Sequence, residues 1–268
     1  MRFIFSITLT ALLLGASHAA GRVVTLVPSF ADDLYALGAG SQLVAVSAFT
    51  DAPQASTLPR VADATSVNTE AIVALQPSVV VGIPAQARFV EPLRRANIPV
   101  VLLPDDTYEQ IFTNLRALGS LTGHQVQATA TIERLQRETA VLTARVQRFA
   151  RHPSLFVVLG VSPIWTAGSD SYISKLIELA GGLNAAGDLH AAYGQYSTEA
   201  LLRDQPDLLV VDPATRLDSI TDREPWRSLR AVQRHQVYSV NPDILERPGA
   251  RYNEGLRWLL ERIEPLAR

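Results

Sequence analysis

The sequence contains no cysteine. Disulfide bonds are therefore excluded, and the hydrophobic core alone must hold the fold together. The absence also removes the residue to which a bacterial lipoprotein attaches its lipid. Of the 268 residues, 47% are hydrophobic and 19% are charged, which is the ordinary composition of a globular protein. The chain is long enough for one large domain or two medium ones.

An excess of charge of one sign is also lacking. The formal net charge is −2, Lys175 is the only lysine, and arginine carries the remaining positive charge. Proteins that bind nucleic acids through their surface charge have a marked basic excess. We therefore predict no nucleic-acid partner.

Long hydrophobic runs are missing as well. The longest one at the N-terminus, Phe3 to Leu14, follows Arg2 and precedes the small-residue segment Ser17-His18-Ala19. It is too short for the ~20 residues that a membrane-spanning helix needs, which disfavours a membrane anchor. The pattern predicts a signal peptide over residues 1–20, cleaved near Ala19 or Ala20. The mature protein is expected to be soluble in the periplasm, without a lipid anchor.

What the sequence does contain is a regular alternation of strands and helices. Short β-branched or apolar runs at 22–29, 42–49, 78–83 and 98–104 predict strands, and the segments 31–40, 68–77, 87–96 and 107–122 between and after them predict helices. The fully apolar strand SVVVGI is typical of a parallel sheet covered on both faces. The fold class is therefore α/β.

The second half repeats the plan of the first. TEAIVALQPSVVV begins at Thr69 and TEALLRDQPDLLVV begins at Thr198, so that Glu70 and Glu199 lie 129 residues apart (199 − 70). Chance similarity between two helix–strand joints is the alternative, but the order of the neighbouring elements also matches. We predict two similar lobes with parallel-type sheets, at 21–123 and 153–268.

Residues 124–152 lie between the lobes and contain no glycine or proline. Ile132, Leu135, Leu142, Val146 and Phe149 fall on one face at helical spacing. We predict one long rigid α-helix, roughly 40 Å in length at 1.5 Å per residue, that bridges the two lobes.

Catalytic signatures are absent. The sequence has no G-x-S-x-G turn, no phosphate-binding loop and no cysteine nucleophile. Its histidines do not form pairs at metal-ligand spacing, and the Asp105-Asp106 pair reads as solvent-facing loop or cap residues. We predict no catalytic residues, no metal site and no resident cofactor.

Aromatic and charged side chains occur where strands end. Phe49 ends a strand, Trp165 follows one in PIWTAG, and Tyr193 lies in the predicted loop AAYGQY. Ligands of open α/β sheets bind at the carboxyl ends of strands, so these rings are candidate cleft residues. The alternative is that they fill local loop cores. The loop NPDILERPGARY adds Asp243, Arg247 and Arg251 as candidate ligand contacts or, alternatively, as caps of the last helix.

These segments together resemble a known family. RVVTLVPS, VSAFTDAP, VNTEAIVALQPSVVV, SPIWTAG, YSTEALLRDQPDLLVV and DILERPGAR are similar to segments of the class III periplasmic substrate-binding proteins of ABC importers. The resemblance extends from RVVTLVPS to WLLERIEP. It implies two α/β lobes joined by one helix, and a bulky metal chelate as ligand: vitamin B12, a ferric siderophore or haem.

The resemblance also implies partners and roles. Glu70 and Glu199 match the residues that dock on the two permease subunits, although both also suit the first turn of a helix. The protein is then a monomer that serves a permease dimer and its ATPase.

For the ligand, Phe49, Trp165, Tyr193 and Asp243 match the pattern of the vitamin B12-binding branch, which the chain resembles most, and a cobalt corrinoid is the leading expectation. DATSVN and VVGIPAQA lack rings expected there. A ferric siderophore would instead use Arg88, Arg247 or Arg251, and haem would use Tyr193 or His190. An exported α/β enzyme and a structural adaptor are the alternatives from other classes.

Overall fold

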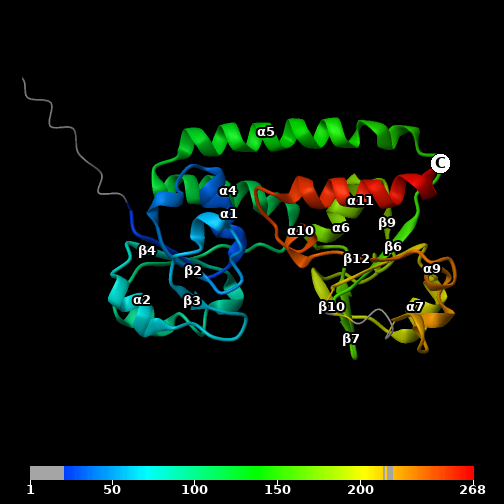
Figure 1. The fold of residues 1–268 in the computed structure, drawn as a ribbon, viewed down its shortest axis with the longest axis horizontal. Coiled ribbons are helices and arrows are strands. Elements are labelled where there is room, and N and C mark those ends of the chain that lie inside the picture. The colour runs from blue at the N-terminus through cyan, green and yellow to red at the C-terminus, as the bar shows by residue number, and fades with distance from the viewer. Residues whose placement is uncertain (1–20, 214, 216–219) are drawn as a thin grey trace, which may run out of the picture.

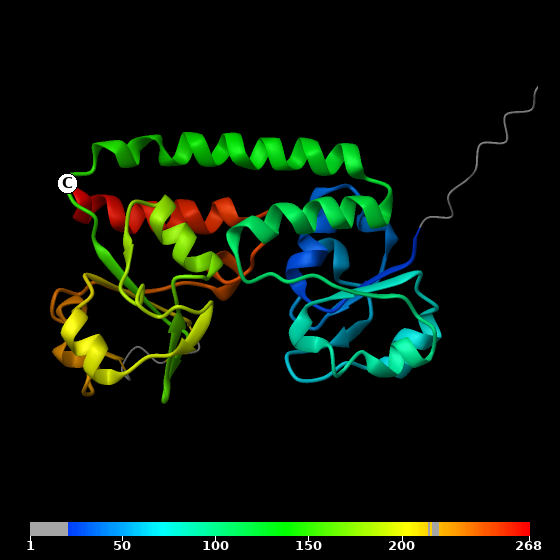
Figure 2. The same ribbon diagram turned by 180° about the vertical axis from the view of Figure 1, so that it is seen from behind.

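The computed structural model describes residues 21–213, 215 and 220–268. The predicted signal peptide lies outside these residues. Two α/β lobes stand side by side, and helix α5 (Gln125–Thr143) lies along one side of both (Figures 1 and 2). The predicted fold class, α/β with two similar lobes joined by one helix, is confirmed.

The first lobe is built on a five-stranded parallel sheet with the order β3-β2-β1-β4-β5. Its strands are β1 (Val23–Thr25), β2 (Leu43–Ser47), β3 (Arg60–Ala62), β4 (Val79–Gly82) and β5 (Val100–Leu102). Its helices are α1 (Pro28–Ala36), α2 (Thr69–Leu75), α3 (Glu91–Arg95) and α4 (Tyr108–Thr122), with short 3₁₀ turns at Gly40–Gln42, Pro53–Ala55 and Pro84–Gln86. Strand β3 was not predicted, because its three residues begin with the exposed Arg60.

The second lobe has a four-stranded parallel sheet with the order β12-β11-β6-β9. Its strands are β6 (Ser154–Val158), β9 (Leu183–Asn184), β11 (Leu208–Val211) and β12 (Val237–Ser239). A separate antiparallel sheet has the order β10-β8-β7, from β7 (Gly160–Val161), β8 (Ile164–Ala167) and β10 (Tyr193–Gln195). The helices are α6 (Tyr172–Leu179), α7 (Thr198–Asp204), α9 (Arg230–Gln233), α10 (Pro242–Leu245) and α11 (Tyr252–Ala267), with 3₁₀ turns at Ala144–Arg148 and Trp226–Ser228.

The antiparallel sheet corrects the expected loop positions of two rings. Trp165 lies in β8 and Tyr193 in β10, and these two strands pair directly. The run 154–163, predicted as one strand, is divided at Leu159, where the chain leaves β6 and turns back through Pro163. Neither partner strand carries a long apolar run, so local sequence pattern gave no signal for the pairing.

The internal repeat is visible in the sheet order. The series β2-β1-β4-β5 of the first lobe corresponds to β9-β6-β11-β12 of the second. Both sheets are covered on both faces. In the first lobe, Val79 and Val81 face the large shared core, whereas Val80 faces an outer cluster. In the second lobe, Leu208 faces the shared core and Leu209 faces an outer cluster. This confirms the parallel, doubly covered sheets expected from the apolar strands.

The repeated phrase forms the same structure twice. Asn68 caps α2 by accepting a hydrogen bond from the Ala71 amide at 3.0 Å, and Ser197 caps α7 through the Ala200 amide at 3.0 Å. Each helix ends at a glutamine in the left-handed region, with φ 47° at Gln76 and φ 46° at Gln205. A proline follows each glutamine and prevents further helix. The match in backbone angles supports a true repeat rather than chance similarity.

The two caps should contribute equally to stability. We expect Asn68→Ala and Ser197→Ala each to lower the free energy of unfolding by about 1 kcal/mol, because each leaves a helix amide without its acceptor. The double variant should show the sum, since the sites lie in different lobes. Urea unfolding of the single and double variants measures this, with the exposed Ser56→Ala as the control. Unchanged midpoints in both cap variants would contradict the prediction.

The joining helix is shorter than predicted. α5 has 19 residues and ends at Thr143, followed by the 3₁₀ turn Ala144–Arg148, so residues 144–152 are not α-helical as the sequence suggested. The side chain of Phe149 lies against Gly181, and Nδ1 of His152 is 2.9 Å from the Gly181 carbonyl oxygen. These contacts direct the chain down into β6. At 1.5 Å per residue the α-helix is about 28 Å long.

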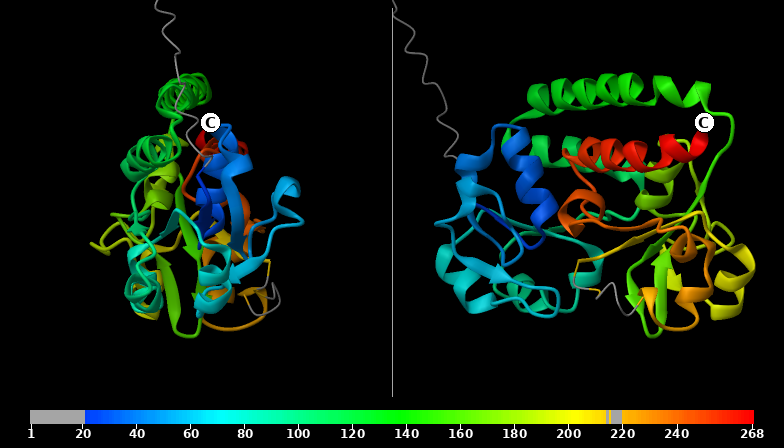
Figure 3. Two further views of the ribbon diagram at one scale, coloured as in Figure 1. Left: turned by 90° about the vertical axis from the view of Figure 1, so that its left-hand side faces the viewer. Right: turned by 45° about the vertical axis from the view of Figure 1, so that its right-hand side comes forward.

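The lobes share one hydrophobic core beneath α5. The predicted stripe is confirmed, since Ile132 and Leu135 are buried and Leu142, Val146 and Phe149 pack against the same cluster. α5 packs on α4 and on α11 (Figure 3). Tyr108 and Tyr252 meet edge to face with ring centroids 5.2 Å apart, so aromatic contacts join the lobes. The boundaries of the lobes, with the joining segment at 124–152, stay a prediction. Among the described residues, no helix is long and apolar enough to cross a membrane.

Candidate functional site

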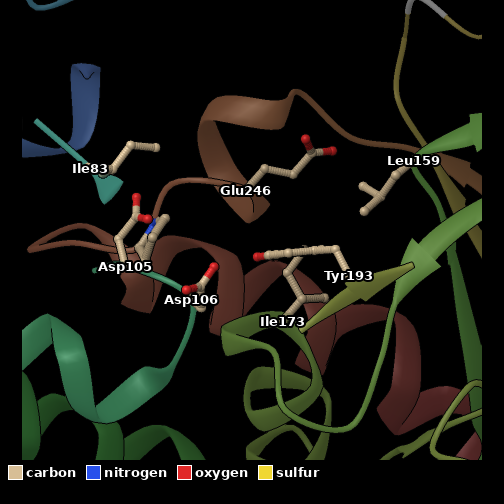
Figure 4. A pocket seen from close by; sticks show the side chains of 8 residues that line it. Ile83, Asp105, Asp106, Leu159, Ile173, Tyr193 and Glu246 are labelled. Carbon is tan, nitrogen blue, oxygen red and sulfur yellow. The ribbon is translucent and has the colours of Figure 1, made fainter. Parts of the chain in front are cut away.

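A cavity of 330 Å³ lies where the two lobes face each other. Its walls come from the segments that follow β4, β5 and β6, together with α6, β10 and the loop after α10. Figure 4 shows the lining side chains converging on the cavity, and the complete lining is Ile83, Asp105, Asp106, Leu159, Ile173, Tyr193, Glu246 and Pro248. The carboxyl ends of parallel strands from both lobes therefore meet here, where open α/β sheets bind their ligands.

A second hollow of 260 Å³ adjoins the cavity on the first-lobe side. Ile83 lines both. The second hollow also contains the rings of Phe49 and Phe89, and Phe49 is 56% exposed although it is large and apolar. A large ring left open to solvent in a hollow is a ready contact surface for an apolar ligand face.

The interlobe cavity is acidic. Burial, followed by the charges of Asp212 and Asp243, raises the pKa of Glu246 to about 7. Burial and the neighbouring Asp106 carboxylate raise the pKa of Asp105 to about 6. These carboxyl groups titrate near neutral pH because they are crowded and poorly solvated. The site therefore favours hydrogen-bond donors and disfavours further negative charge.

Tyr193 lies across the middle of the cavity. Its strand β10 pairs with β8 through Tyr193 and Ala167, and its hydroxyl end points to the side formed by Asp105 and Asp106 (Figure 4). Burial, and then the charges of Asp105 and Asp106, raise the pKa of the phenol well above its ordinary value. The ring is thus a neutral apolar surface with one hydrogen-bonding end.

Trp165 lies outside both hollows. It is 40% exposed on β8, opposite Gly160 on β7 and Gln195 on β10. Its ring belongs to the second lobe, like Tyr193, but it does not line the cavity. Of the three predicted rings, the structure brings Tyr193 and Phe49 to adjoining hollows and leaves Trp165 on the antiparallel sheet.

The predicted polar contacts are engaged with one another. The Arg247 side chain is only 10% exposed and forms ion pairs with Asp51 at 2.6 Å and with Asp243. Arg251 pairs with Glu254 at 2.9 Å, and its guanidinium lies 3.7 Å from Asp32. Neither arginine lines the interlobe cavity, so a direct ligand contact from either one stays a prediction.

Arg88 and His190, which were also named for iron chelates, lie away from the cavity. Arg88 is exposed and its guanidinium lies 4.5 Å from the Phe89 ring centroid. His190 is exposed, with Nδ1 3.4 Å from the Ser169 hydroxyl oxygen. Within the described part of the chain, no three carboxylate, imidazole or thiol side chains gather closely enough to hold a metal ion.

Of the eight residues that line the cavity, only Tyr193 was predicted as a ligand contact. Asp105 was expected to face solvent; Asp106 does so, but Asp105 is half-buried. Glu246 lies in the loop that suggested Asp243, and Ile83 ends the apolar strand SVVVGI. Phe89 provides a first-lobe ring in addition to Phe49. The available signal was position, since Ile83 ends one predicted parallel strand and Asp105 follows directly on another.

The repeated glutamates occupy matching sites on the surface. Glu70 and Glu199 are both exposed in the first turns of α2 and α7. Both helices lie on the side of the molecule away from α5, one on each lobe (Figures 1 and 2). A two-fold partner could therefore meet one acidic residue from each lobe on the same face.

Comparison with known proteins gives consistent results. The family model described as "Periplasmic binding protein" matches residues 23–244. The vitamin B12-binding protein of Pectobacterium atrosepticum is 32% identical over 263 residues, which cover 94% of this chain and 92% of that protein.

Among solved structures, the periplasmic vitamin B12 binding protein BtuF of Vibrio cholerae is 27% identical with a TM-score of 0.77, covering 92% of this chain and 98% of that one. A periplasmic heme binding protein of Pseudomonas aeruginosa is 26% identical with a TM-score of 0.80, and the match covers 92% of this chain and 94% of that one.

Proposed function

This chain belongs to the periplasmic binding protein family, in the class III group of ABC importers, and from that premise we propose that it binds a corrinoid, vitamin B12, between its lobes. It then delivers the ligand unchanged to a permease dimer with its ATPase. The small-molecule metal chelate is cargo, and the binding protein acts as a monomer.

The observation that carries this proposal is the acidic lining of the interlobe cavity. The rim of a corrinoid carries carboxamide groups, whose N–H groups donate hydrogen bonds. Asp105, Asp106 and Glu246 can accept these bonds. Haem carries propionate carboxylates, which the same three residues would repel. Tyr193 and Phe49 supply the apolar surfaces for the corrin ring.

Haem is the second candidate, because a phenol stands in the cavity and can serve as an iron ligand. Tyr193 would have to give up its proton to bind ferric iron as a phenolate. Its raised pKa makes that ionisation more difficult than in water. Tyr193 therefore suits a corrinoid, which it would contact as a neutral ring, better than haem, which it would bind as a phenolate.

The remaining contacts are proposals of unequal support. Asp243 is half-buried in the first turn of α10, where it shares Arg247 with Asp51, and we propose that it also accepts a corrinoid amide. A Trp165 contact requires the ligand to extend beyond the cavity or the lobes to move closer. We also propose export to the periplasm through residues 1–20, in agreement with the periplasmic location of the similar vitamin B12 binding protein of Vibrio cholerae.

The test is calorimetric titration of residues 21–268 with cyanocobalamin, with hemin and a ferric hydroxamate in parallel. Saturable one-to-one binding of cyanocobalamin alone supports the proposal. Binding of hemin or the ferric chelate without cyanocobalamin would overturn the ligand and retain the family role. Conversion of any ligand to a product would indicate an enzyme instead.

The affinity for cyanocobalamin should rise with pH. Glu246 and Asp105, with pKa values of about 7 and about 6, accept amide N–H bonds best when ionised. Ligand binding therefore lowers both pKa values and releases protons, so the affinity increases between pH 5.5 and 8, by about three- to tenfold. Titrations across this range measure the slope.

Glu246→Gln should flatten this slope, whereas Glu133→Gln on the exposed face of α5 should leave it unchanged. An anionic chelate would show the opposite slope, because protonated carboxyl groups repel it less. An affinity for cyanocobalamin that falls with rising pH would therefore contradict the amide–carboxylate contacts.

A further inference from the structure

The segment Glu246–Arg251 of the second lobe lies against the first lobe. The Ala250 amide donates a hydrogen bond to Oδ1 of Asp33 at 2.7 Å, and Asp33 is fully buried in α1. A Cβ added at Gly249 would lie 2.8 Å from the same carboxylate oxygen, so any larger residue would require the Asp33 side chain to move. The loop after α10 is thus fixed to α1 at the side of the cleft.

Arg247 extends this contact toward the ligand hollow. Its guanidinium donates to Oδ1 of Asp51 at 2.6 Å and to the backbone carbonyl oxygen of Phe49 at 2.7 Å. On its own lobe it pairs with Asp243, four residues earlier. One side chain therefore bonds the loop that carries the Phe49 ring, the acid that follows it, and the acid at the start of α10.

The charges around Arg247 make it difficult to replace. Asp32, which is buried, has a carboxylate oxygen 3.6 Å from the Arg247 guanidinium, so the three acids Asp32, Asp51 and Asp243 surround it. Burial alone would raise the pKa of Asp51, but the hydrogen bond and charge of Arg247 outweigh burial and lower it. A lysine has the charge but lacks the planar fork that reaches Asp51 and the Phe49 carbonyl together.

Arg247 also has little freedom to contact a ligand. Its side chain is 10% exposed, and its bonds to Asp51, Asp243 and the Phe49 carbonyl use both terminal nitrogens. The Phe49 ring, by contrast, is 56% exposed in the first-lobe hollow. The Phe49 ring is therefore accessible to a ligand, whereas the Arg247 side chain that fixes its loop is not.

We propose that Arg247 is a positioning residue: it fixes the Phe49–Asp51 loop of the first lobe to α10 of the second and thereby sets both the Phe49 ring and the spacing of the lobes. Its effect on ligand capture rests on the proposed function; its effect on lobe spacing does not. The role differs from the direct ligand contact expected from the sequence.

The absence of cysteine allows a direct test. Arg95→Cys on α3 and Gln233→Cys on α9 place one exposed thiol on each lobe. Spin labels at these two sites report the distribution of interlobe distances by pulsed electron double resonance. The measurement is made on the ligand-free mature protein carrying Arg247→Gln, Arg247→Lys or Asp51→Asn, and each variant is also titrated with cyanocobalamin.

We expect a narrow distance distribution in the parent, a broad one in Arg247→Gln, and intermediate widths in Arg247→Lys and Asp51→Asn. The affinity for cyanocobalamin should fall in the same order, by at least about tenfold for Arg247→Gln. Arg145→Gln removes a partly exposed ion pair to Glu264 at 3.2 Å. It should change neither the width of the distance distribution nor the affinity for cyanocobalamin. If Arg247→Gln fails to fold, the distance distribution and affinity of Asp51→Asn test the proposal instead.

Two outcomes would overturn the proposal. Narrow distributions with unchanged affinity would mean that the network positions nothing. Weaker affinity with an unchanged distribution would mean that Arg247 does not set the spacing of the lobes. If the parent does not bind cyanocobalamin, the proposed ligand fails, and the distance distributions still decide whether Arg247 fixes the lobes.

Discussion

Replacing Glu70 and Glu199 together with alanine is expected to reduce uptake of the ligand at least about tenfold, because truncating one partner of a hydrogen-bonded charge pair that becomes buried at an interface costs about 2–5 kcal/mol. Ligand affinity should not change, since both residues are exposed on α2 and α7 and neither lines the cleft. The measurements are uptake through the cognate importer and calorimetric titration of the same protein.

The matched control is Glu109→Ala, which removes an exposed acid from the first turn of α4. It should leave both uptake and affinity at the parent values. Each single variant, Glu70→Ala or Glu199→Ala, should retain intermediate uptake, because one lobe still docks. Parent-like uptake in the double variant would mean that the two acids only favour their helices through the macrodipole.

Replacing Tyr193 with alanine is expected to weaken cyanocobalamin binding by about 1–3 kcal/mol, or roughly five- to 150-fold, through lost burial and ring contact. Its ring stands in the middle of the cavity, between walls from both lobes. Calorimetric titration of the variant measures the loss. Tyr193→Phe retains the ring and should lose severalfold at most.

Trp165→Ala serves as the comparison, since Trp165 is a larger ring on the neighbouring strand but outside both hollows. A smaller loss for Trp165→Ala than for Tyr193→Ala would agree with the geometry of the cavity. The reverse order would show that the ligand sits over the antiparallel sheet, and would move the site from the 330 Å³ cavity to the β8 surface.

The sequence predicted the elements whose causes are local. The apolar run at Val79–Gly82 became a fully buried parallel strand, and the predicted helix 107–122 became α4, with Thr107 as its N-cap. The repeat of α2 and α7 could be read from Thr-Glu-Ala and Gln-Pro at the same spacing. These features depend on neighbours within one turn or one strand.

The rest depends on contacts between distant segments. Strands β8 and β10 are 26 residues apart at their first paired positions (193 − 167), and no local pattern specifies their pairing. Asp105 is half-buried in a cavity that residues of the second lobe also line. Arg247 was identified as important from its loop, but its partners Asp51 and Phe49 lie in the other lobe, so its bonds could not be predicted.

The shared core beneath α5 limits how this architecture can be changed. One continuous cluster includes Phe30 and Leu115 of the first lobe and Leu155 and Leu256 of the second, and Tyr108 donates a hydrogen bond to Tyr252 across the boundary at 3.1 Å. Either half by itself would expose this apolar surface to water. The lobes are therefore not modular: neither half can be exchanged, permuted out or expressed alone without reshaping the surface it shares with the other.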